Sequence, residues 1–370
     1  MKKICFLIIA CISFLSYSEN VRVRIYAEDK IKEVSFGVSF GSYTLNNRDI
    51  KRQDKLKAVL SEGKVEIYLN EKLLDKVDTL KLSSEDLKCF FQITPTGLKQ
   101  RRYDNNLEIY PTKDKQFLML INNVECENYI AGVVQSEAGG ASDNTEFFKV
   151  QAICCRTYMQ RNINKHKKEG FNLCDCVNCQ VYFSRANKEQ VIEGSMKTKG
   201  EVILDSLGKP IETLFHSNSG GETVNAKDVW GKEVSYLQPV RDTFSINQKN
   251  YTWEKEIREK DWLNYFKSKG IDLKKESNKQ EILNFSQQDG RKNNILGINL
   301  VQIRKDFNLK STYFSVKQWG SNVKLIGRGY GHGVGLSQEG AAEMCEEGYE
   351  YWQVIEHYYT GVKIKEIKNQ

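Results

Sequence analysis

The stretch from Glu127 to Arg161 constrains the fold more than any other part of this 370-residue chain. Its first part has apolar residues at the spacing of a helix that buries one face, namely Tyr129, Ile130, Val133 and Val134. The pattern then breaks at Ala138-Gly139-Gly140, where the backbone can approach a ligand closely. A second helix is expected to begin at Asp143, a good N-cap residue that has Glu146 three positions later. The stretch therefore predicts two consecutive helices joined by a glycine-containing turn.

A carboxyl group lies where the first predicted helix ends. Glu137 follows the apolar residues of that helix directly. A carboxyl group held between apolar side chains has a raised pKa, because burial disfavours its charged form. Such a group can serve as a general acid. The competing interpretation is an ordinary glutamate that faces water, because strongly perturbed carboxyl groups are a minority.

The two predicted helices resemble a known family. The patterns Y-x-x-G-V-V-x-x-E, beginning at Tyr129, and Q-A-x-x-x-R-T-Y, beginning at Gln151, are similar to the core of the SpoIID/LytB family, stage II sporulation protein D and its relatives. The family usually has Met-Pro after the glutamate, where this chain has Ala138-Gly139. Three further patterns, in the same order as in the family, extend the resemblance over most of the chain.

Three cysteines lie close together after the second predicted helix, at Cys174, Cys176 and Cys179. Thiolates at this spacing suit Zn²⁺, with a further ligand from elsewhere in the chain. Disulfides formed in an oxidising compartment are the alternative for these three. Free, partly buried thiols are the alternative for the other cysteines of the mature chain, namely Cys89, Cys126, Cys154, Cys155 and Cys345. The resemblance implies zinc, because many family members have C-D-x-x-H-C-Q-x-Y here. This chain has Asn178 in place of the family histidine, so either Cys176 replaces that ligand or the site holds no metal.

A polar loop is expected at His216-Ser217-Asn218-Ser219-Gly220-Gly221, at the end of a hairpin formed by residues 200–204 and 211–216. Its side chains and backbone N–H groups could bond a sugar or its N-acetyl group. A plain polar turn is the competing interpretation. A serine nucleophile activated by the histidine is disfavoured, because neighbouring residues on a strand point to opposite faces. The family has H-S-x-S-G-G at this place.

Alternate glycines surround one histidine near the end of the chain, where residues 327–341 read GRGYGHGVGLSQEGA. Such a run indicates unusual backbone dihedral angles or close contacts. It lacks the Gly-Lys-Ser/Thr end of a Walker loop and does not open a βαβ unit, so no nucleotide is expected. The family has G-x-G-x-G-H-G-V-G-L-S-Q-x-G-A here, which makes His332, Ser337 and Gln338 candidate site residues.

The rest of the chain sets the domain organisation. Residues 1–18 combine a basic start, an apolar run and a small-x-small pattern, typical of a secretory signal. Export to the periplasm, the cell surface or the outer face of the cytoplasmic membrane is therefore expected. Short alternating runs predict a β-rich lobe over residues 19–123. A mixed helix/sheet catalytic domain is expected over residues 124–370, with a less informative insert at about 243–318, so the fold class is α+β.

The charge of the chain excludes one class of partner. The net charge is +7, but no Lys/Arg cluster with interleaved aromatic residues indicates nucleic-acid binding. A basic exported protein could instead favour an anionic wall polymer.

The family resemblance implies a peptidoglycan lytic transglycosylase, acting in cell-wall remodelling or sporulation-type engulfment. Such an enzyme cleaves the β-1,4 bond between N-acetylmuramic acid and N-acetylglucosamine in peptide-stripped strands and leaves a 1,6-anhydro end. Glu137 would be its single general acid and base. The residues expected to position the substrate or to support the site are Gln151, Arg156, His216, Ser217, Ser219, Gly220, Gly221, His332, Ser337 and Gln338.

Two other functions were weighed against this enzyme. The first, also attached to family members, is a non-catalytic glycan-binding protein that modulates an N-acetylmuramoyl-L-alanine amidase. The second, a zinc amidase or peptidase, would need a ligand motif such as H-E-x-x-H, which the sequence lacks.

Overall fold

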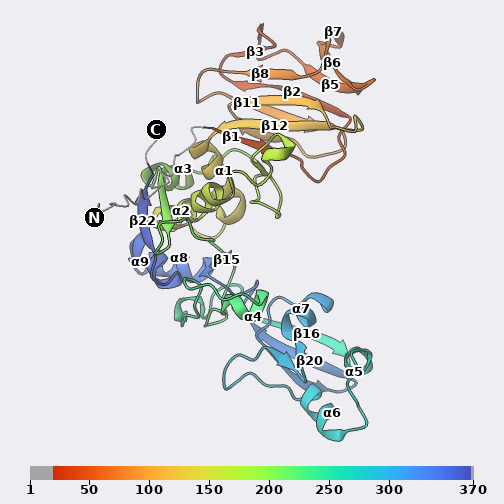
Figure 1. Cartoon of the computed structure of the whole chain (residues 1–370), viewed down its shortest axis with the longest axis vertical. Helices are drawn as coiled ribbons and strands as arrows, with labels where there is room; N and C mark the ends of the chain where they lie inside the picture. Colours follow the sequence, from red (N-terminus) through yellow and green to blue (C-terminus); the bar gives the residue numbers. More distant parts are fainter. Residues whose placement is uncertain (1–19, 368–370) are drawn as a thin grey trace, which may run out of the picture.

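The computed structural model describes residues 20–367, which form three parts that follow one another along a curved line (Figure 1). The predicted signal at residues 1–18 lies outside the described residues. Within residues 20–367, none of the helices has both the length and the apolar character needed to cross a bilayer. The mixture of helices and sheets confirms the predicted α+β class.

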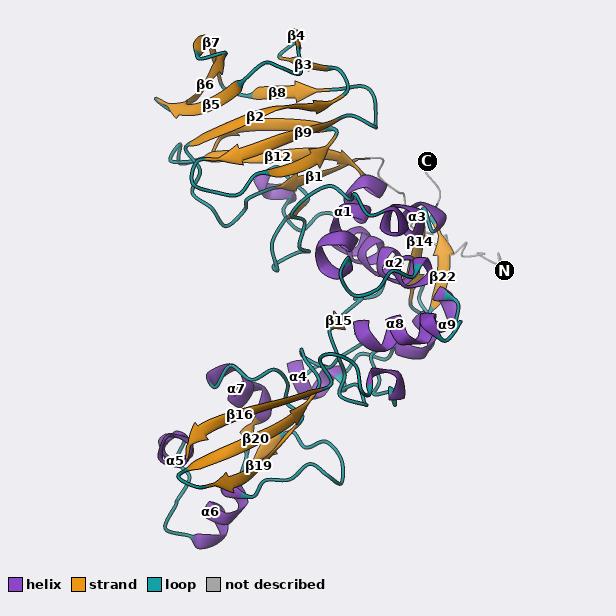
Figure 2. Ribbon diagram, turned by 180° about the vertical axis from the view of Figure 1, so that it is seen from behind, coloured by secondary structure: helices purple, strands orange, loops and turns teal. Residues whose placement is uncertain are grey.

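The first part is a sandwich of two sheets whose facing side chains form its core (Figure 2). Strand β9 alternates buried and partly buried residues over its whole length, as expected from the period-two pattern that predicted a β-rich lobe. In spatial order, the first sheet contains β13 (Leu173–Cys174), β1 (Asn20–Arg24), β12 (Leu118–Glu125), β11 (Asn106–Pro111), β8 (Leu80–Ser83), β3 (Tyr43–Leu45) and β4 (Arg48–Ile50). The second contains β10 (Arg101–Asp104), β9 (Phe90–Pro95), β2 (Glu33–Phe40), β5 (Leu56–Ser61), β6 (Lys64–Leu69) and β7 (Lys72–Val77).

The middle part is mainly helical, and its core is continuous with that of the sandwich. Its larger helices are α1 (Cys126–Ala138), α2 (Thr145–Asn162), α3 (Glu189–Lys197), α8 (Gln338–Glu346) and α9 (Tyr351–Tyr358). Short elements connect them, namely η1 (Lys167–Glu169), α4 (Ala226–Trp230) and η2 (Thr243–Ser245). Strand β14 (Glu201–Leu204) pairs with β22 (Lys363–Glu366), and β15 (Phe215–His216) pairs in parallel with β21 (Leu336–Ser337).

Two local predictions in the middle part were wrong. The N-cap of α2 is Asn144, whose side chain accepts a hydrogen bond from the backbone N–H of Glu146, whereas Asp143 forms an ion pair with Lys188. The expected hairpin between residues 200–204 and 211–216 is reduced to a tight turn with one bridge, between Leu204 and Pro210. The reason is that β14 and β15 each pair with a strand from the end of the chain.

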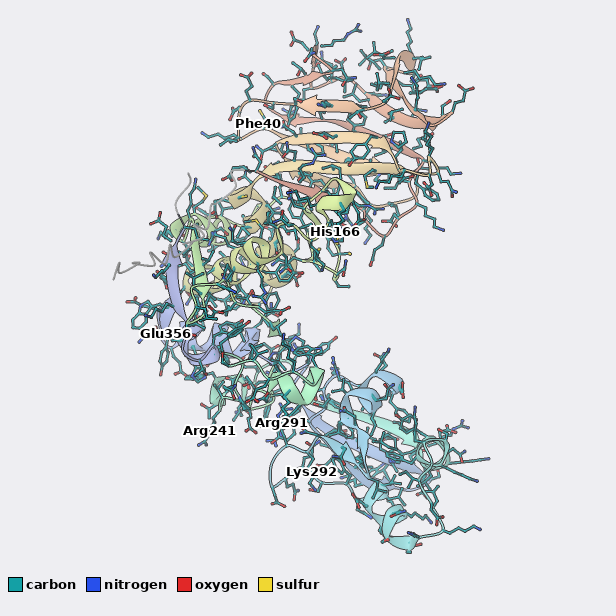
Figure 3. All side chains as sticks on the ribbon, viewed as in Figure 1. Phe40, His166, Arg241, Arg291, Lys292 and Glu356 are labelled. Carbon is teal, nitrogen blue, oxygen red and sulfur yellow. The ribbon has the colours of Figure 1, made fainter. Side chains whose placement is uncertain are left out.

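The third part lies at the opposite end of the molecule from the sandwich and has a hydrophobic core of its own (Figure 1). A sheet in the order β16 (Thr252–Arg258), β20 (Asn322–Arg328) and β19 (Phe314–Trp319) packs with α5 (Glu259–Ser268), α6 (Glu276–Leu283) and α7 (Leu300–Asp306), and β17 (Asn294–Ile295) pairs with β18 (Ile298–Asn299). Arg291 lies where this part meets the middle part (Figure 3). Its guanidinium donates hydrogen bonds to the carbonyl oxygens of Ser219 and Glu222.

Candidate active site

Glu137 occupies the last turn of α1, where a loop of the chain closes over it. The backbone N–H of Val181 donates a hydrogen bond of 2.8 Å to Oε1 of Glu137. The backbone N–H of Phe183 donates one of 3.1 Å to the hydroxyl of Ser136. Burial raises the pKa of Glu137 above its ordinary value, and the bond from Val181 opposes that rise without cancelling it. The carboxyl group is thus disposed to carry a proton at higher pH than an ordinary glutamate.

Gly132 explains how the loop can lie so close to α1. A Cβ atom at this position would lie 2.4 Å from Cε2 of Tyr182 and 2.7 Å from the carbonyl oxygen of Ser184. Tyr182 is fully buried and its hydroxyl donates a hydrogen bond of 3.0 Å to Oδ1 of Asn122 in β12. The glycine of the Y-x-x-G-V-V pattern therefore makes room for the tyrosine that anchors the loop over Glu137.

Two of the predicted site residues, one from each half of the chain, meet between α2 and α8. The side-chain amide of Gln338 donates to Oε1 of Gln151 across 3.4 Å. Gln151 is fully buried, and its Nε2 has no hydrogen-bond partner among the described residues. The structure thus brings the second and the last motif together at the first turn of α8.

Arg156 lies in the core and not in a site. Its guanidinium is 0% exposed and forms a two-pronged ion pair with Glu127, with Nε–Oε1 and Nη2–Oε2 distances of 3.0 and 2.5 Å. It also donates hydrogen bonds to the carbonyl oxygens of Glu201 and Ser195. The prediction that Arg156 contacts a substrate does not fit this arrangement. Its guanidinium is buried in the core and already forms two hydrogen bonds with the carboxylate of Glu127.

Two histidines and a tryptophan form an aromatic cluster. The ring of His332 lies 5.4 Å from that of His216 and 5.2 Å from that of Trp230, which is 51% exposed. Nδ1 of His216 bonds the carbonyl oxygen of Val334, while its buried Nε2 has no partner among the described residues. Burial lowers the pKa of His332 to about 4 and that of His216 well below its usual range, so both rings are neutral near pH 7.

The serines of the predicted site contact the protein itself. Ser219 donates a hydrogen bond of 2.7 Å to Asp242, and Ser337 caps α8 by accepting a bond from the backbone N–H of Gly340. The hydroxyl of Ser217 accepts a bond of 3.1 Å from Asn250. These contacts give the three serines a part in shaping the loop that was predicted to bind a sugar.

The two glycines of that loop adopt backbone conformations that other residues avoid. Gly220 and Gly221 have φ values of 77° and 102°. A Cβ atom on Gly220 would also lie 2.9 Å from the backbone of Arg328 in β20. The glycines therefore let the loop pass close to the third part of the molecule.

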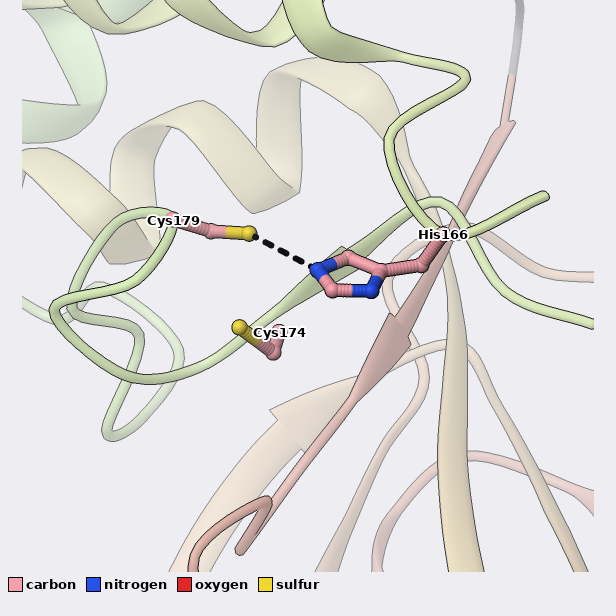
Figure 4. Close-up of side chains that lie close together, drawn as sticks. All are labelled: His166, Cys174 and Cys179. Atoms are coloured by element: carbon pink, nitrogen blue, oxygen red, sulfur yellow. Dashed lines mark hydrogen bonds between the residues drawn. The ribbon is translucent and has the colours of Figure 1, made fainter. Parts of the chain in front are cut away.

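A cluster of metal-binding side chains lies beside the loop over Glu137. Nε2 of His166 is 3.5 Å from Sγ of Cys179, and the two ligand atoms lie within 4.8 Å of Sγ of Cys174 (Figure 4). Sγ of Cys176 is 3.4 Å from Sγ of Cys174. A hydrogen bond from Cys174 is the main cause that lowers the pKa of Cys179 to about 7, which favours the thiolate. None of the eight cysteines within residues 20–367 forms a disulfide.

The geometry of this cluster fits zinc. Zinc bonds of about 2.3 Å to sulfur and about 2.0–2.1 Å to nitrogen, in a tetrahedron, place the two ligand atoms about 3.5 Å apart. That is the separation of Cys179 and His166. His166 was not among the predicted ligands, because the sequence indicated a further ligand from elsewhere in the chain without identifying it. The signal that could have found it was a histidine shortly before the cysteines, after the end of the second helix.

Comparison with known proteins agrees with the predicted resemblance. The model of the family described as "Stage II sporulation protein" matches residues 114–204, which include α1, α2 and the cysteine cluster. Stage II sporulation protein D of Bacillus amyloliquefaciens is 29% identical over 66% of this chain and 76% of its own length. The protein of the same name from Bacillus subtilis is 28% identical over 70% of this chain and 79% of its own length. The "Amidase enhancer" of Bacillus subtilis is 25% identical over 64% of this chain and 40% of its own length. Residues 114–204 thus carry the match to the SpoIID family model, and about two thirds of the chain is similar to stage II sporulation protein D.

Proposed function

We propose that this protein is a peptidoglycan lytic transglycosylase that acts on the cell wall in sporulation-type remodelling. One observation carries the proposal, namely that Glu137 is a half-buried carboxyl group with a raised pKa. Within residues 20–367, the groups that shift this pKa include no second carboxylate. Glycosidases that activate water typically need two carboxylates, whereas an intramolecular nucleophile can work with one.

In the proposed reaction, protonated Glu137 gives its proton to the oxygen that links N-acetylmuramic acid to N-acetylglucosamine. The bond from C1 of the muramic residue to that oxygen breaks, and N-acetylglucosamine leaves with a free 4-hydroxyl group. The 6-hydroxyl oxygen of the same muramic residue bonds to C1 and closes the 1,6-anhydro ring. The carboxylate of Glu137 then takes the proton of that hydroxyl, so that no water is consumed and the acid is restored.

The contact of Glu137 with Val181 and the candidate sugar-binding side chains support the proposal. The N–H of Val181 can donate a hydrogen bond to the carboxylate that forms after the first proton transfer. This bond partly offsets the rise that burial causes in the pKa of Glu137. The exposed ring of Trp230, beside the neutral ring of His332, could stack on a sugar. Gln338 offers an amide group of the kind that bonds sugar hydroxyl and N-acetyl groups, and the fully buried Gln151 accepts a hydrogen bond from it.

We also propose that His166, Cys174 and Cys179 hold zinc, with Cys176 as the fourth ligand. The metal would have a structural role. Cys179 is only two residues from Val181, and the N–H of Val181 donates a hydrogen bond to Glu137. By fixing the cysteine loop, it would fix the donor that holds the carboxyl group. No step of the cleavage is assigned to the metal.

The proposal is tested by digesting purified, peptide-free glycan strands with residues 19–370 and identifying the products by mass spectrometry. Wild type and Glu356→Gln, an exposed control, should yield 1,6-anhydro ends. Glu137→Gln should lower the rate by at least about 10²–10⁴-fold, the usual contribution of a general acid. Reducing ends from wild type would show a hydrolase instead and would contradict the proposed reaction.

The second candidate function is a wall-binding protein that modulates an amidase. It is favoured by one observation, the similarity to a protein named amidase enhancer. No cleavage by wild type, combined with equal strand binding by wild type and Glu137→Gln, would select it. A cell-wall amidase assayed with and without this chain would then show a change in its rate.

A further inference from the structure

The outer face of the second sheet of the sandwich is hollowed into a groove that the mechanism does not use. One cavity of about 630 Å³ lies over β9, β2, β5 and β6, and residues 52–57 form one of its walls. A second cavity of about 280 Å³ shares Val38, Arg52 and Gln92 with it and reaches Arg102. Because the two cavities share three lining residues, we treat them as one groove, called here the sheet groove.

The small side chains of a central strand cause the hollow. Strand β2 lies between β9 and β5, and its outward positions carry Ser35, Gly37 and then Ser39. The pairing of β2 with β9 shifts between Val38 and Phe40, so Ser39 sits in a bulge. Its hydroxyl oxygen is buried and has no hydrogen-bond partner among the described residues. The floor of the sheet groove therefore contains an unsatisfied polar group.

The uncharged side chains in the lining of the sheet groove suit a sugar polymer. The uncharged side chains that line the cavities include amide, hydroxyl and aromatic groups, among them Gln53, Gln92, Gln100, Thr94 and Tyr68. Amides and hydroxyls bond the N-acetyl and hydroxyl groups of a glycan, and an aromatic ring can stack on a sugar. An ordinary solvated sheet face is the plainer interpretation. It does not account for a cavity of this volume or for the buried hydroxyl of Ser39.

The charge of the lining favours an anionic polymer. Four cationic side chains line the two cavities, against two carboxylates, Asp54 and Glu71, so the lining has a net charge of 4 − 2 = +2. The four are Arg52, Lys55, Lys57 and Arg102. A glycan strand without its stem peptides has a free carboxylate on each muramic residue. Such a strand therefore combines the neutral and the charged groups that the sheet groove complements.

The sheet groove ends one loop away from Glu137. The carbonyl oxygen of Arg102 accepts hydrogen bonds from the backbone N–H of Arg185, at 2.7 Å, and from the hydroxyl of Ser184. Residues 181–185 are the loop whose Val181 N–H contacts Glu137. The loop that contacts Glu137 thus also contacts Arg102, which lines one end of the groove.

We propose that the sheet groove binds the part of an anionic, peptide-free glycan strand that lies beyond the bond to be cleaved. This inference rests on the proposed function for the position of that bond. The strand would pass from Glu137 over residues 181–185 and into the groove. The β-rich part of the protein would then select long strands over short ones.

The test compares strand binding by full-length variants in a Glu137→Gln background, so that cleavage cannot change the ligand. Ser35→Trp fills the floor of the groove from an exposed position, and Gln92→Ala removes an amide from its wall. Lys72→Ala, an exposed change on β7 outside both cavities, is the control. The probes are long peptide-free strands, a tetrasaccharide of the same composition and an uncharged chitin oligomer matched in length to the long strands. Circular dichroism checks that each variant is folded.

Both groove variants should weaken the binding of long strands about tenfold, which is about 1.4 kcal/mol, and leave the tetrasaccharide unaffected. The chitin oligomer should bind more weakly than the long strands to the parent protein. Unchanged binding of long strands by both groove variants, or equal binding of chitin, would overturn the inference even if wild type cleaves glycan. Loss of long-strand binding in the variants, with no cleavage by wild type, would support the groove and refute the transglycosylase.

Discussion

Replacing Arg156 by methionine should separate a structural role of this residue from a part in substrate binding. The change removes the charge and keeps most of the volume. Glu127, only 1% exposed, would then keep a buried carboxylate without its cation. Breaking a buried ion pair on one side costs about 3–5 kcal/mol. The loss of stability in Arg156→Met should lie near the lower end of this range, because the backbone N–H of Gly200 still donates a hydrogen bond of 3.3 Å to Glu127.

The second hydrophobic core provides an internal control for the effect of Arg156→Met on the melting temperature. The sandwich and the helical part share one core, and residues 252–328 have a second core. For a unit of this size, each kcal/mol shifts the melting temperature by about 2–4 °C, so a loss of about 3 kcal/mol should lower the melting temperature of the larger core by about 6–12 °C. Differential scanning calorimetry should show that shift, with the transition of the smaller core unchanged.

A double variant makes the test sharper. Glu127→Leu combined with Arg156→Met replaces the pair by apolar side chains of similar volume, which is often neutral for stability. The double variant should therefore be more stable than Arg156→Met alone. The reasoning is refuted if Arg156→Met melts as wild type does but no longer binds glycan strands. It is also refuted if the second change brings no recovery.

Three further predictions concern Glu137 and the loop over it. Because burial raises its pKa and the protonated form is the acid, the cleavage rate should fall with rising pH through a pKa above 4.5, and a pH–rate profile that falls at or below 4.5 contradicts this. His166→Ala should reduce the zinc content of the purified protein from one ion per chain, as measured by elemental analysis. Cys89→Ser lies outside the cluster and should leave the zinc content unchanged. Equal zinc content in the two variants refutes the proposed ligand set. Gly132→Ala should gain about 1 kcal/mol of helix propensity but lose about 1–3 kcal/mol to the contact with Tyr182. A net loss in chemical denaturation and a lower cleavage rate are expected, and a more stable, fully active variant would show that the loop can move away at no cost.

The parts of the structure that depend on local patterns could be predicted from the sequence. The helical spacing of Tyr129 and Val133 predicted α1, and the same spacing predicted that Glu137 would be held beside apolar residues. Alternation predicted strands such as β6 (Lys64–Leu69). These predictions succeeded because periodicity reports directly on which face of an element is buried.

The parts that depend on distant partners could not be predicted in this way. Arg156 was interpreted as a ligand contact because its partner, Glu127, lies 29 residues away and carries no local signal. The hairpin after Glu201 was overestimated because the strand that pairs with β14 comes from residues 363–366. His166 was missed because its position in space next to Cys179 is set by the turn after α2. In each case a tertiary contact overrode the local pattern.

The contact made by Arg291 restricts how this protein can change during evolution. Residues 252–328 enter and leave their sheet as neighbours, because Thr252 is paired with Arg328. A segment with adjacent ends can be shortened, enlarged or exchanged with little disturbance to the rest of the protein. Arg291, however, belongs to this segment and donates hydrogen bonds to the carbonyl oxygens of Ser219 and Glu222. A descendant that loses the segment must therefore acquire a replacement donor for these two carbonyls, or remodel the histidine-serine loop at the same time.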